Sequence, residues 1–513
     1  MTRDRGLRSG ESYFGNRSAM ALCALLALGC ASRPAAEEMP TPVMQPAEVP
    51  TDTPKVASLD RSKPPTLGAP PDLTLPVMTR TTLPNGLELV IVEQHELPVA
   101  DFILLVQTGG EGDPARKAGV ASLTAAMLQE GTTSRTSLDI ADQEAYLGAN
   151  IQTGSGWDAT NISLHTPTAQ LDSALALFAD VALRPNWSTK ELARLRDERM
   201  TSLMQIRDRA PAIADRAYAS ILYGGDHPYG RPLTGTEAST KAIQRADLQR
   251  FYGTYFRPNN ATMIIVGDVS ASDITPRVEA LFGKWSPGKV PNVEFREPRL
   301  PAATTVYLID KPGAPQSSVR IGTVGVPRST DDYFALLVMN TILGGSFTSR
   351  LNANLRETKG YTYGANSRFD MRRAAGPFTA RAEVTGGKTD SSLFEFMKEL
   401  RAIRDTVPSP ELEKAKRYLQ LGLPARFETT GDIASQIIPI VLYDLPTDYF
   451  NTYVRRIEDV TQADIQRVAN RYVDPARMSI VIVGDRKSIE PGLKGLGMGD
   501  IVIRDLSGQP VRP

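Results

Sequence analysis

The hydrophobic residues of segment 77–290 follow two kinds of pattern. Short apolar runs, such as LELVIVE and ADFILLVQT, have the length and the β-branched content of buried strands. Other stretches repeat their apolar residues every three or four positions, which predicts amphipathic helices. We expect strands at 87–93, 100–108, 151–165 and 262–266, and helices at about 115–129, 169–183, 189–209, 211–222 and 247–255. Because the two kinds of element are mixed without strict alternation, the expected fold class is α+β, with a mixed sheet packed against helices.

The second half of the chain repeats the first. The segment Ala246–Arg250 (ADLQR) recurs 217 positions later as Ala463–Arg467 (ADIQR), and the tetrapeptide IVGD recurs at the same spacing. An ungapped match of this kind indicates two copies of one domain, with a period far longer than that of a solenoid repeat. We place the copies at 77–290 and 303–505, joined by a proline- and charge-rich linker at 291–302. The chain is therefore expected to form two tandem homologous α/β sandwich domains.

Charge and the rarest residues exclude several classes of function. The 513-residue chain has 58 Lys and Arg against 58 Asp and Glu, and without a basic excess no nucleic-acid partner is expected. The two cysteines, Cys23 and Cys30, lie near the N-terminus, which excludes a disulfide or a thiolate metal site in the rest of the chain. The histidines, His95, His165 and His227, are too far apart in sequence for two of them to bind zinc from one helix.

The N-terminus has the features of an export signal. Residues 1–29 combine several arginines with the apolar run AMALCALLALG. The sequence Ala-Leu-Gly-Cys that ends at Cys30 resembles a bacterial lipobox, whose cysteine becomes the lipidated first residue of the mature chain. A simple signal peptide with an incidental cysteine is the alternative. Residues 30–76 are rich in proline and contain no aromatic residue, so we expect a lipid anchor followed by a disordered tether. These features predict a lipoprotein of the bacterial cell envelope, facing the periplasm from the outer membrane.

Three motifs resemble those of a known peptidase family. They are Gly119-Val120-Ala121 leading into Gly131-Thr132, the tetrapeptide HPYG that begins at His227, and the block GGSFTSRLNANLRETKGYTY at 344–363. Together with the duplication, they make residues 77–505 similar to the pitrilysin/insulinase family of zinc peptidases, which place H-x-x-E-H on a helix. The resemblance implies half of a clamshell that closes around a peptide substrate.

The metal motif of that family is replaced in this chain. Active members place His, Glu and His at helix positions i, i+3 and i+4, which brings two zinc ligands and the catalytic base onto one face. The aligned positions here are Ser122, Ala125 and Ala126, and the family's third ligand, a glutamate on a later helix, aligns near Ser202. Because none of these side chains is a zinc ligand, the resemblance implies that this chain binds no metal of its own.

Other candidate ligands favour structural roles. Glu198 is expected to be a solvated helix charge beside neighbouring arginines, and Glu130 a surface residue at a helix end. His227 lies in a glycine-rich stretch and is expected to cap or pack rather than to bind metal. His95 and His165 follow strand-like runs and are expected to be structural or exposed.

A second family feature is retained in the C-terminal half. Family members carry an arginine and a tyrosine seven residues apart, which bind the substrate backbone and stabilise the oxyanion at the zinc of the opposite half. Arg356 and Tyr363 have that spacing. A guanidinium and a phenol are hydrogen-bond donors suited to developing negative charge. The structural alternative is a helix-end arginine paired with Glu357 and an aromatic ring packed on the sheet.

The resemblance and the lost motif lead to one function and one alternative. We expect a non-catalytic subunit of a heterodimeric zinc metallopeptidase, which supplies Arg356 and Tyr363 to a homologous catalytic chain. That partner would keep the H-x-x-E-H motif, hold the zinc and cleave peptides. The alternative is a lipid-anchored structural or peptide-binding scaffold without a proteolytic role, because fold alone does not fix function. An independent hydrolase is disfavoured, since no cysteine follows Cys30 and no G-x-S-x-G motif is present.

Overall fold

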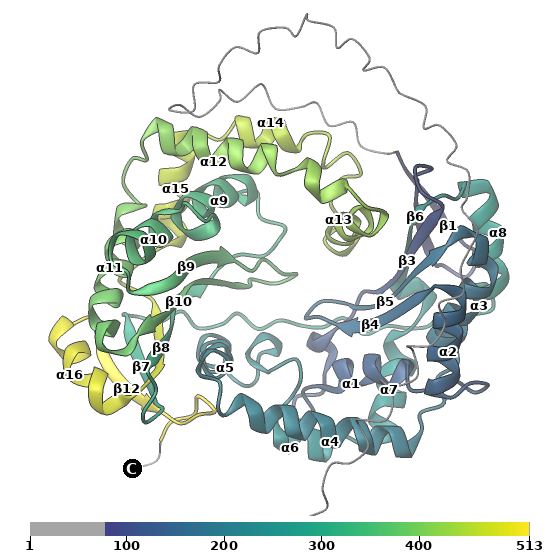
Figure 1. Ribbon diagram of the computed structural model, residues 1–513, viewed down its shortest axis with the longest axis horizontal. Coiled ribbons are helices and arrows are strands. Elements are labelled where there is room, and N and C mark those ends of the chain that lie inside the picture. The colour runs from purple at the N-terminus through teal and green to yellow at the C-terminus, as the bar shows by residue number, and fades with distance from the viewer. Residues whose placement is uncertain (1–76, 512–513) are drawn as a thin grey trace, which may run out of the picture. The chain divides into compact units, whose positions relative to one another are not determined.

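The computed structural model describes residues 77–511, in which twelve strands form two six-stranded sheets (Figure 1). The strand order is β1-β2-β6-β3-β5-β4 in the first sheet and β12-β7-β11-β8-β10-β9 in the second. The strands of the first sheet are β1 (Met78–Thr82), β2 (Glu88–Glu93), β3 (Val99–Val106), β4 (Asn150–Ser155), β5 (Thr160–Pro167) and β6 (Ala261–Gly267). Those of the second are β7 (Thr305–Asp310), β8 (Gln316–Val324), β9 (Thr362–Phe369), β10 (Pro377–Thr385), β11 (Ser479–Gly484) and β12 (Asp500–Arg504). Expectations that fall on residues 1–76, including Cys30, lie outside the described residues.

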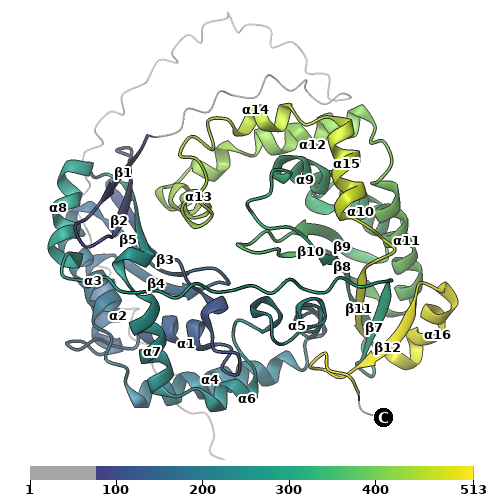
Figure 2. The same ribbon diagram turned by 180° about the vertical axis from the view of Figure 1, so that it is seen from behind.

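Helices accompany both sheets (Figure 2). The helices that precede β7 are α1 (Val120–Leu128), α2 (Ser137–Leu147), α3 (Leu171–Leu183), α4 (Thr189–Ile206), α5 (Ala210–Tyr223), α6 (Glu237–Ala242), α7 (Arg245–Tyr255) and α8 (Ala271–Phe282). Those that follow it are α9 (Tyr333–Asn340), α10 (Arg350–Asn352), α11 (Thr389–Ala402), α12 (Ser409–Leu421), α13 (Thr430–Leu442), α14 (Tyr453–Glu458), α15 (Gln462–Tyr472) and α16 (Arg486–Leu496). Two π-helical segments, η5 (Thr341–Gly345) and η6 (Ala353–Thr358), flank α10. None of the helices within residues 77–511 is long and apolar enough to cross a bilayer.

The duplication read from the sequence is confirmed by the topology. In the first sheet β6 runs parallel to β2 and antiparallel to β3, and in the second sheet β11 runs parallel to β7 and antiparallel to β8. The repeated ADLQR and ADIQR segments open α7 and α15, which both begin with a capping box. The copies differ at one edge, because β1 is antiparallel to β2 whereas β12 is parallel to β7. The two halves are therefore tandem homologous sandwich domains of mixed sheet and helix.

Each sheet is covered on its second face by a helix from the other half. On the first sheet, side chains of β2, β3 and β6 such as Val90 and Ile103 pack against Ile433 and Ile437 of α13. On the second sheet, side chains of β7 and β11 pack against Ile213, Ala217 and Tyr218 of α5. These contacts place α5 beside β8 and β11, and α13 beside β3 and β6 (Figures 1 and 2). We call this arrangement the exchange of α5 and α13, because each helix packs on the sheet of the other half. The two helices are equivalent in the two copies, since α5 follows α4 and α13 follows α12.

The structure corrects several expected elements. The helix expected at 115–129 begins only at Val120, because Gly119 adopts a left-handed conformation with φ of 97°. The strand region expected at 151–165 is a hairpin of β4 and β5. The helix expected at 189–209 ends at Ile206. The sequence interpretation missed α2, which buries only Ile140 and Leu147 and so has a weak apolar period.

Truncation of a side chain on α13 tests the exchange of helices. Ile437 is 3% exposed and packs on the first sheet, so we expect Ile437→Ala to lower the free energy of unfolding by about 2–5 kcal/mol. Urea unfolding of the whole chain measures this change. As a matched control on the same helix, Ser435→Ala removes an exposed hydroxyl and should change stability by less than about 0.5 kcal/mol. Equal effects of the two substitutions would show that α13 does not hold the first sheet.

Candidate functional site

A buried carboxylate caps the N-terminus of helix α1. Asp113 accepts hydrogen bonds from the backbone N–H groups of Gly119, at 2.6 Å, and of Ala121, at 2.7 Å. These bonds satisfy donors that the first turn of a helix leaves without partners. Burial raises the pKa of Asp113 to about 7, although the two hydrogen bonds and nearby arginines act in the opposite direction. A Cβ at Gly119 would lie 3.0 Å from the backbone nitrogen of Gly235, so only glycine fits this turn.

The positions aligned with the zinc motif lie on α1 and contact an arginine. Ser122 Oγ donates to the Leu233 carbonyl oxygen at 2.9 Å and accepts from Arg199 Nη1 at 3.0 Å. The same guanidinium donates to the carbonyl of the residue before α1, at 3.0 Å. Ala125 is buried and Ala126 is half-buried, each with only a methyl side chain. Arg199 therefore ties α4 to the first turn of α1 where the resemblance places a metal ligand.

These residues do not fit a zinc ion. The methyl groups of Ala125 and Ala126 offer no lone pair, and the Ser122 hydroxyl is already hydrogen-bonded. The Arg199 guanidinium brings a positive charge to the same place, and burial lowers the pKa of that group because the cation loses hydration. Across residues 77–511, no group of three or more His, Cys, Asp or Glu side chains is placed to hold a metal. No step of a reaction is therefore assigned to a metal on this chain.

Helix α4 engages the remaining carboxylates in ion pairs. Ser202 is exposed and its Oγ donates to the Glu198 carbonyl at 3.0 Å. The exposed carboxylate of Glu198 pairs with Arg194 at 2.6 Å, which confirms the expected solvated helix charge. The expectation for Glu130 was wrong, because its side chain is only 15% exposed and forms an ion pair with Arg194. A carboxylate turned inward after the end of α1 needs such a counter-charge.

The histidines have the structural roles expected from the sequence. His227 is buried, and its Nδ1 accepts the backbone N–H of Tyr229 at 3.0 Å, which caps the turn Pro228–Gly230. Its ring packs 4.9 Å from that of Tyr223. His95 and His165 are exposed, and each pairs with one aspartate.

Arg356 and Tyr363 lie at the end of η6 and the start of β9. The Arg356 guanidinium lies over the Phe347 ring, 4.5 Å from its centroid, and its Nε is 3.4 Å from Glu357. The ion pair of the structural alternative is thus present, but the packing of Tyr363 on the sheet is not, because this side chain is 93% exposed. Phe347, itself 66% exposed, was missed because nothing in the sequence places its ring under the arginine. The role of Arg356 and Tyr363 stays a prediction.

A polar cluster between the halves was not foreseen from the sequence. We call Glu111, Asp158, Tyr229, Arg373 and Tyr443 the inter-half cluster. Asp158 accepts from the hydroxyls of Tyr229, at 2.6 Å, and Tyr443, at 3.2 Å, and from the Arg373 backbone N–H at 2.7 Å. Arg373 also pairs with Glu111 at 3.4 Å. Burial raises the pKa of Glu111 to about 8, against the attraction of Arg373.

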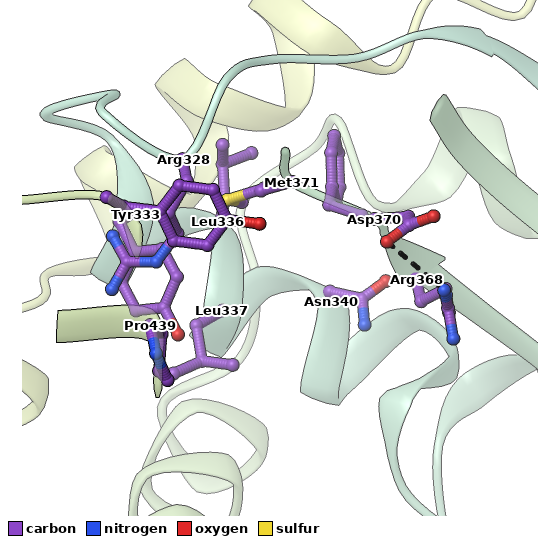
Figure 3. Close-up of a pocket in the computed structure, with 11 residues that line it drawn as sticks. Arg328, Tyr333, Leu336, Leu337, Asn340, Arg368, Asp370, Met371 and Pro439 are labelled. Atoms are coloured by element: carbon purple, nitrogen blue, oxygen red, sulfur yellow. Dashed lines mark ion pairs between the residues drawn. The ribbon is translucent and has the colours of Figure 1, made fainter. Parts of the chain in front are cut away.

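A cavity of about 450 Å³ lies beside this cluster, between α9, the end of β9 and α13 (Figure 3). Its polar lining includes Arg328, which stacks 3.6 Å from the centroid of the Tyr333 ring. Arg368 pairs with Asp370 at 3.2 Å on the opposite wall. The rest of the lining is mostly apolar, and Tyr443 joins the cavity to the inter-half cluster. Its residues come from segments distant in the sequence, which is why no local motif pointed to it.

Comparison with known proteins agrees with this fold. Residues 89–237 match the insulinase family (Peptidase family M16), and residues 242–419 match the Peptidase M16 inactive domain. An uncharacterized zinc protease of Mycobacterium tuberculosis is 27% identical over 418 residues, which cover 80% of this chain and 93% of that protein. A probable mitochondrial-processing peptidase subunit beta of Arabidopsis thaliana is 22% identical over 431 residues, covering 80% of this chain and 79% of the relative.

Solved structures show the same architecture. A peptidase M16 inactive domain from Pseudomonas fluorescens superimposes with a TM-score of 0.75 and 27% identity, over 79% of this chain and 98% of that one. A protease from Helicobacter pylori shares the fold, with a TM-score of 0.72 and 21% identity over 80% of this chain and 100% of that one. Two tandem sandwich domains of this kind define a peptidase-like chain, and within residues 77–511 no cluster of His, Cys, Asp or Glu is placed to hold a metal. The chain belongs to the M16 family of insulinase-like peptidases.

The raised pKa of Glu111 predicts a dependence of stability on pH. A carboxyl whose pKa is higher in the folded than in the unfolded state stabilises the fold at low pH and loses that contribution as pH rises. For Glu111 the loss spans its ordinary value of 4.5 up to about 8, and Asp113, with a pKa of about 7, acts in the same direction. Glu111→Gln should reduce the slope of unfolding free energy against pH by up to about 1.4 kcal/mol per unit in this range.

Urea unfolding of both proteins from about pH 5 to about pH 9 measures this slope. The exposed Glu198→Gln serves as the control and should leave the slope of the parent protein in place. An identical slope in the parent and in Glu111→Gln would contradict a raised pKa of Glu111.

Proposed function

We propose that this chain is the non-catalytic subunit of a zinc metallopeptidase, paired with a homologous chain that keeps the H-x-x-E-H motif. The observation that supports this most is the state of α1. The helix keeps its cap and its packing, while the ligand positions hold Ser122, Ala125 and Ala126 with the Arg199 guanidinium beside them. The matches to the insulinase family and to the M16 inactive domain also support the proposal. Relatives named zinc proteases agree with it. Zinc in this proposal belongs to the partner, and peptides are the substrate.

Arg356 and Tyr363 are the residues that this chain would supply to a composite site. Glu357 and the Phe347 ring hold the Arg356 guanidinium, so the cation is oriented before a ligand arrives. The Tyr363 ring is almost entirely exposed, which leaves its hydroxyl free to donate. Both donors gain most when a partner surface excludes water and a negative charge develops on the substrate carbonyl oxygen.

The cell envelope is the proposed location. The export signal of residues 1–29, the lipobox that ends at Cys30 and the proline-rich residues 30–76 support a lipoprotein held by a tether. The absence of an acidic residue directly after Cys30 favours the outer membrane.

Substitutions at the two donors test the composite site. In the complex of this chain with its H-x-x-E-H partner, Arg356→Ala and Tyr363→Phe should each lower peptide turnover by about 10²–10³. The matched control Tyr361→Phe, two residues from Tyr363, should leave turnover unchanged. Assembly should be intact in all variants, and metal analysis of the separated chains should find zinc on the partner alone. Full activity of both donor variants would favour the scaffold without a proteolytic role.

Labelling with palmitate tests the anchor. The full chain expressed in bacteria should incorporate palmitate and fractionate with the outer membrane, and Cys30→Ala should abolish the incorporation because that cysteine is the acceptor. Cys23→Ala, which changes the other cysteine, is the matched control and should still be labelled. Label that survives Cys30→Ala would refute the lipobox.

A further inference from the structure

A second cavity lies where the two halves meet near the C-terminal end of the described chain. It has a volume of about 470 Å³. Its walls are the last turn of α4, one face of α5, the start of α6 and the turn at 506–509. The apolar part of the lining includes Leu203, Ile206 and Leu506, and three arginines complete it: Arg207, Arg216 and Arg231. None of these residues belongs to the site on α1 or to the inter-half cluster.

The positive charge in this cavity exceeds the negative charge. Arg207 forms an ion pair with Glu237, which also lines the cavity. Arg216 and Arg231 form no ion pair with any described residue. Arg216 donates to Thr234 Oγ1 at 3.1 Å, and Arg231 Nη1 donates to the Asp113 carbonyl oxygen at 3.0 Å.

Burial leaves these two guanidiniums short of compensation. The Nε of Arg231 is buried and has no hydrogen-bond partner within residues 77–511. Burial lowers the pKa of Arg216 and of Arg231, and only for Arg231 do the charges of Asp113 and Asp226 oppose this effect. A half-buried cation without an ion-pair contact is costly, and an anion bound by the two guanidiniums would lower that cost.

The cavity is built by tight packing rather than by a loose loop. The turn at its rim is held by Asp505, whose carboxylate accepts the backbone N–H groups of Ser507 and Gln509, both at 2.8 Å. Within that turn a Cβ at Gly508 would lie 2.9 Å from the Ala217 Cα of α5, so the turn sits directly on the helix. The arginines and this wall are therefore positioned before any ligand binds.

We propose that this cavity binds a small organic anion through a phosphate or carboxylate group. The anionic group contacts Arg216 and Arg231, because guanidinium groups form paired, charge-assisted hydrogen bonds with both kinds of oxyanion. The body of the ligand packs on Leu203, Ile206 and Leu506. Because the walls come from both halves, the bound anion also links α5 to the C-terminal turn and stabilises the folded chain.

Titration of the full chain with inorganic phosphate and with citrate tests the site, at an ionic strength held constant with chloride. We expect saturable binding of at least one probe and a rise in the unfolding temperature with its concentration. Arg216→Gln, which keeps a polar side chain but removes the charge, should weaken binding by about tenfold or more. Arg209→Gln removes the charge of an exposed arginine outside the cavity and should leave binding unchanged.

A second variant covers the case in which Arg216→Gln does not fold. Ser507 is exposed at the rim, so Ser507→Glu adds a negative charge there without disturbing the core, and it should weaken binding of the same probe. Tighter binding of phosphate assigns a phosphate-bearing ligand, and tighter binding of citrate assigns a carboxylate. Binding of neither probe, or equal weakening by Arg209→Gln and Arg216→Gln, overturns the proposal.

Discussion

The reciprocal exchange of α5 and α13 is the constraint on which the rest of the structure depends. Both sheets have apolar side chains on both faces, since neighbouring residues such as Leu89 and Val90 of β2 belong to different cores. Helices of the same half cover one face, and the exchanged helix of the other half covers the second. A half on its own would expose an apolar sheet face to water, which opposes its independent folding. The two copies therefore depend on each other to bury the second face of each sheet.

Polar contacts also join each exchanged helix to the other half. Arg320 of β8 is 3% exposed and pairs with Asp215 of α5 at 2.6 Å, while Asp101 of β3 accepts from Thr430 at the start of α13 at 2.5 Å. In both cases a polar contact lies beside the apolar contact of the exchanged helix. The inter-half cluster adds polar contacts around Asp158. Polar groups at such boundaries specify one arrangement because any other would leave them buried without partners.

The sequence predicted what is local and periodic. The central strands, the helices α3, α5 and α7, and the duplication follow from apolar spacing and from the repeated segment ending in Arg250. What it could not predict depends on pairing across long separations. Nothing in the apolar face of α5 says which sheet it covers, and nothing near Ser122 says that Arg199 reaches it. The cavity lined by Arg216 and Arg231 could not be predicted either, because only the fold brings these two residues to the same cavity.

Helix α1 is held in place by contacts that need no metal. The carboxylate of Asp113 caps α1, its apolar side chains belong to the core of the first half, and Arg199 bridges it to α4. The donors Arg356 and Tyr363 are not held by core packing. Their side chains are exposed or partly exposed and contribute little to the core. Stability therefore gives no reason for an exposed arginine and tyrosine at this spacing, whereas the proposed composite site would bury them against a partner.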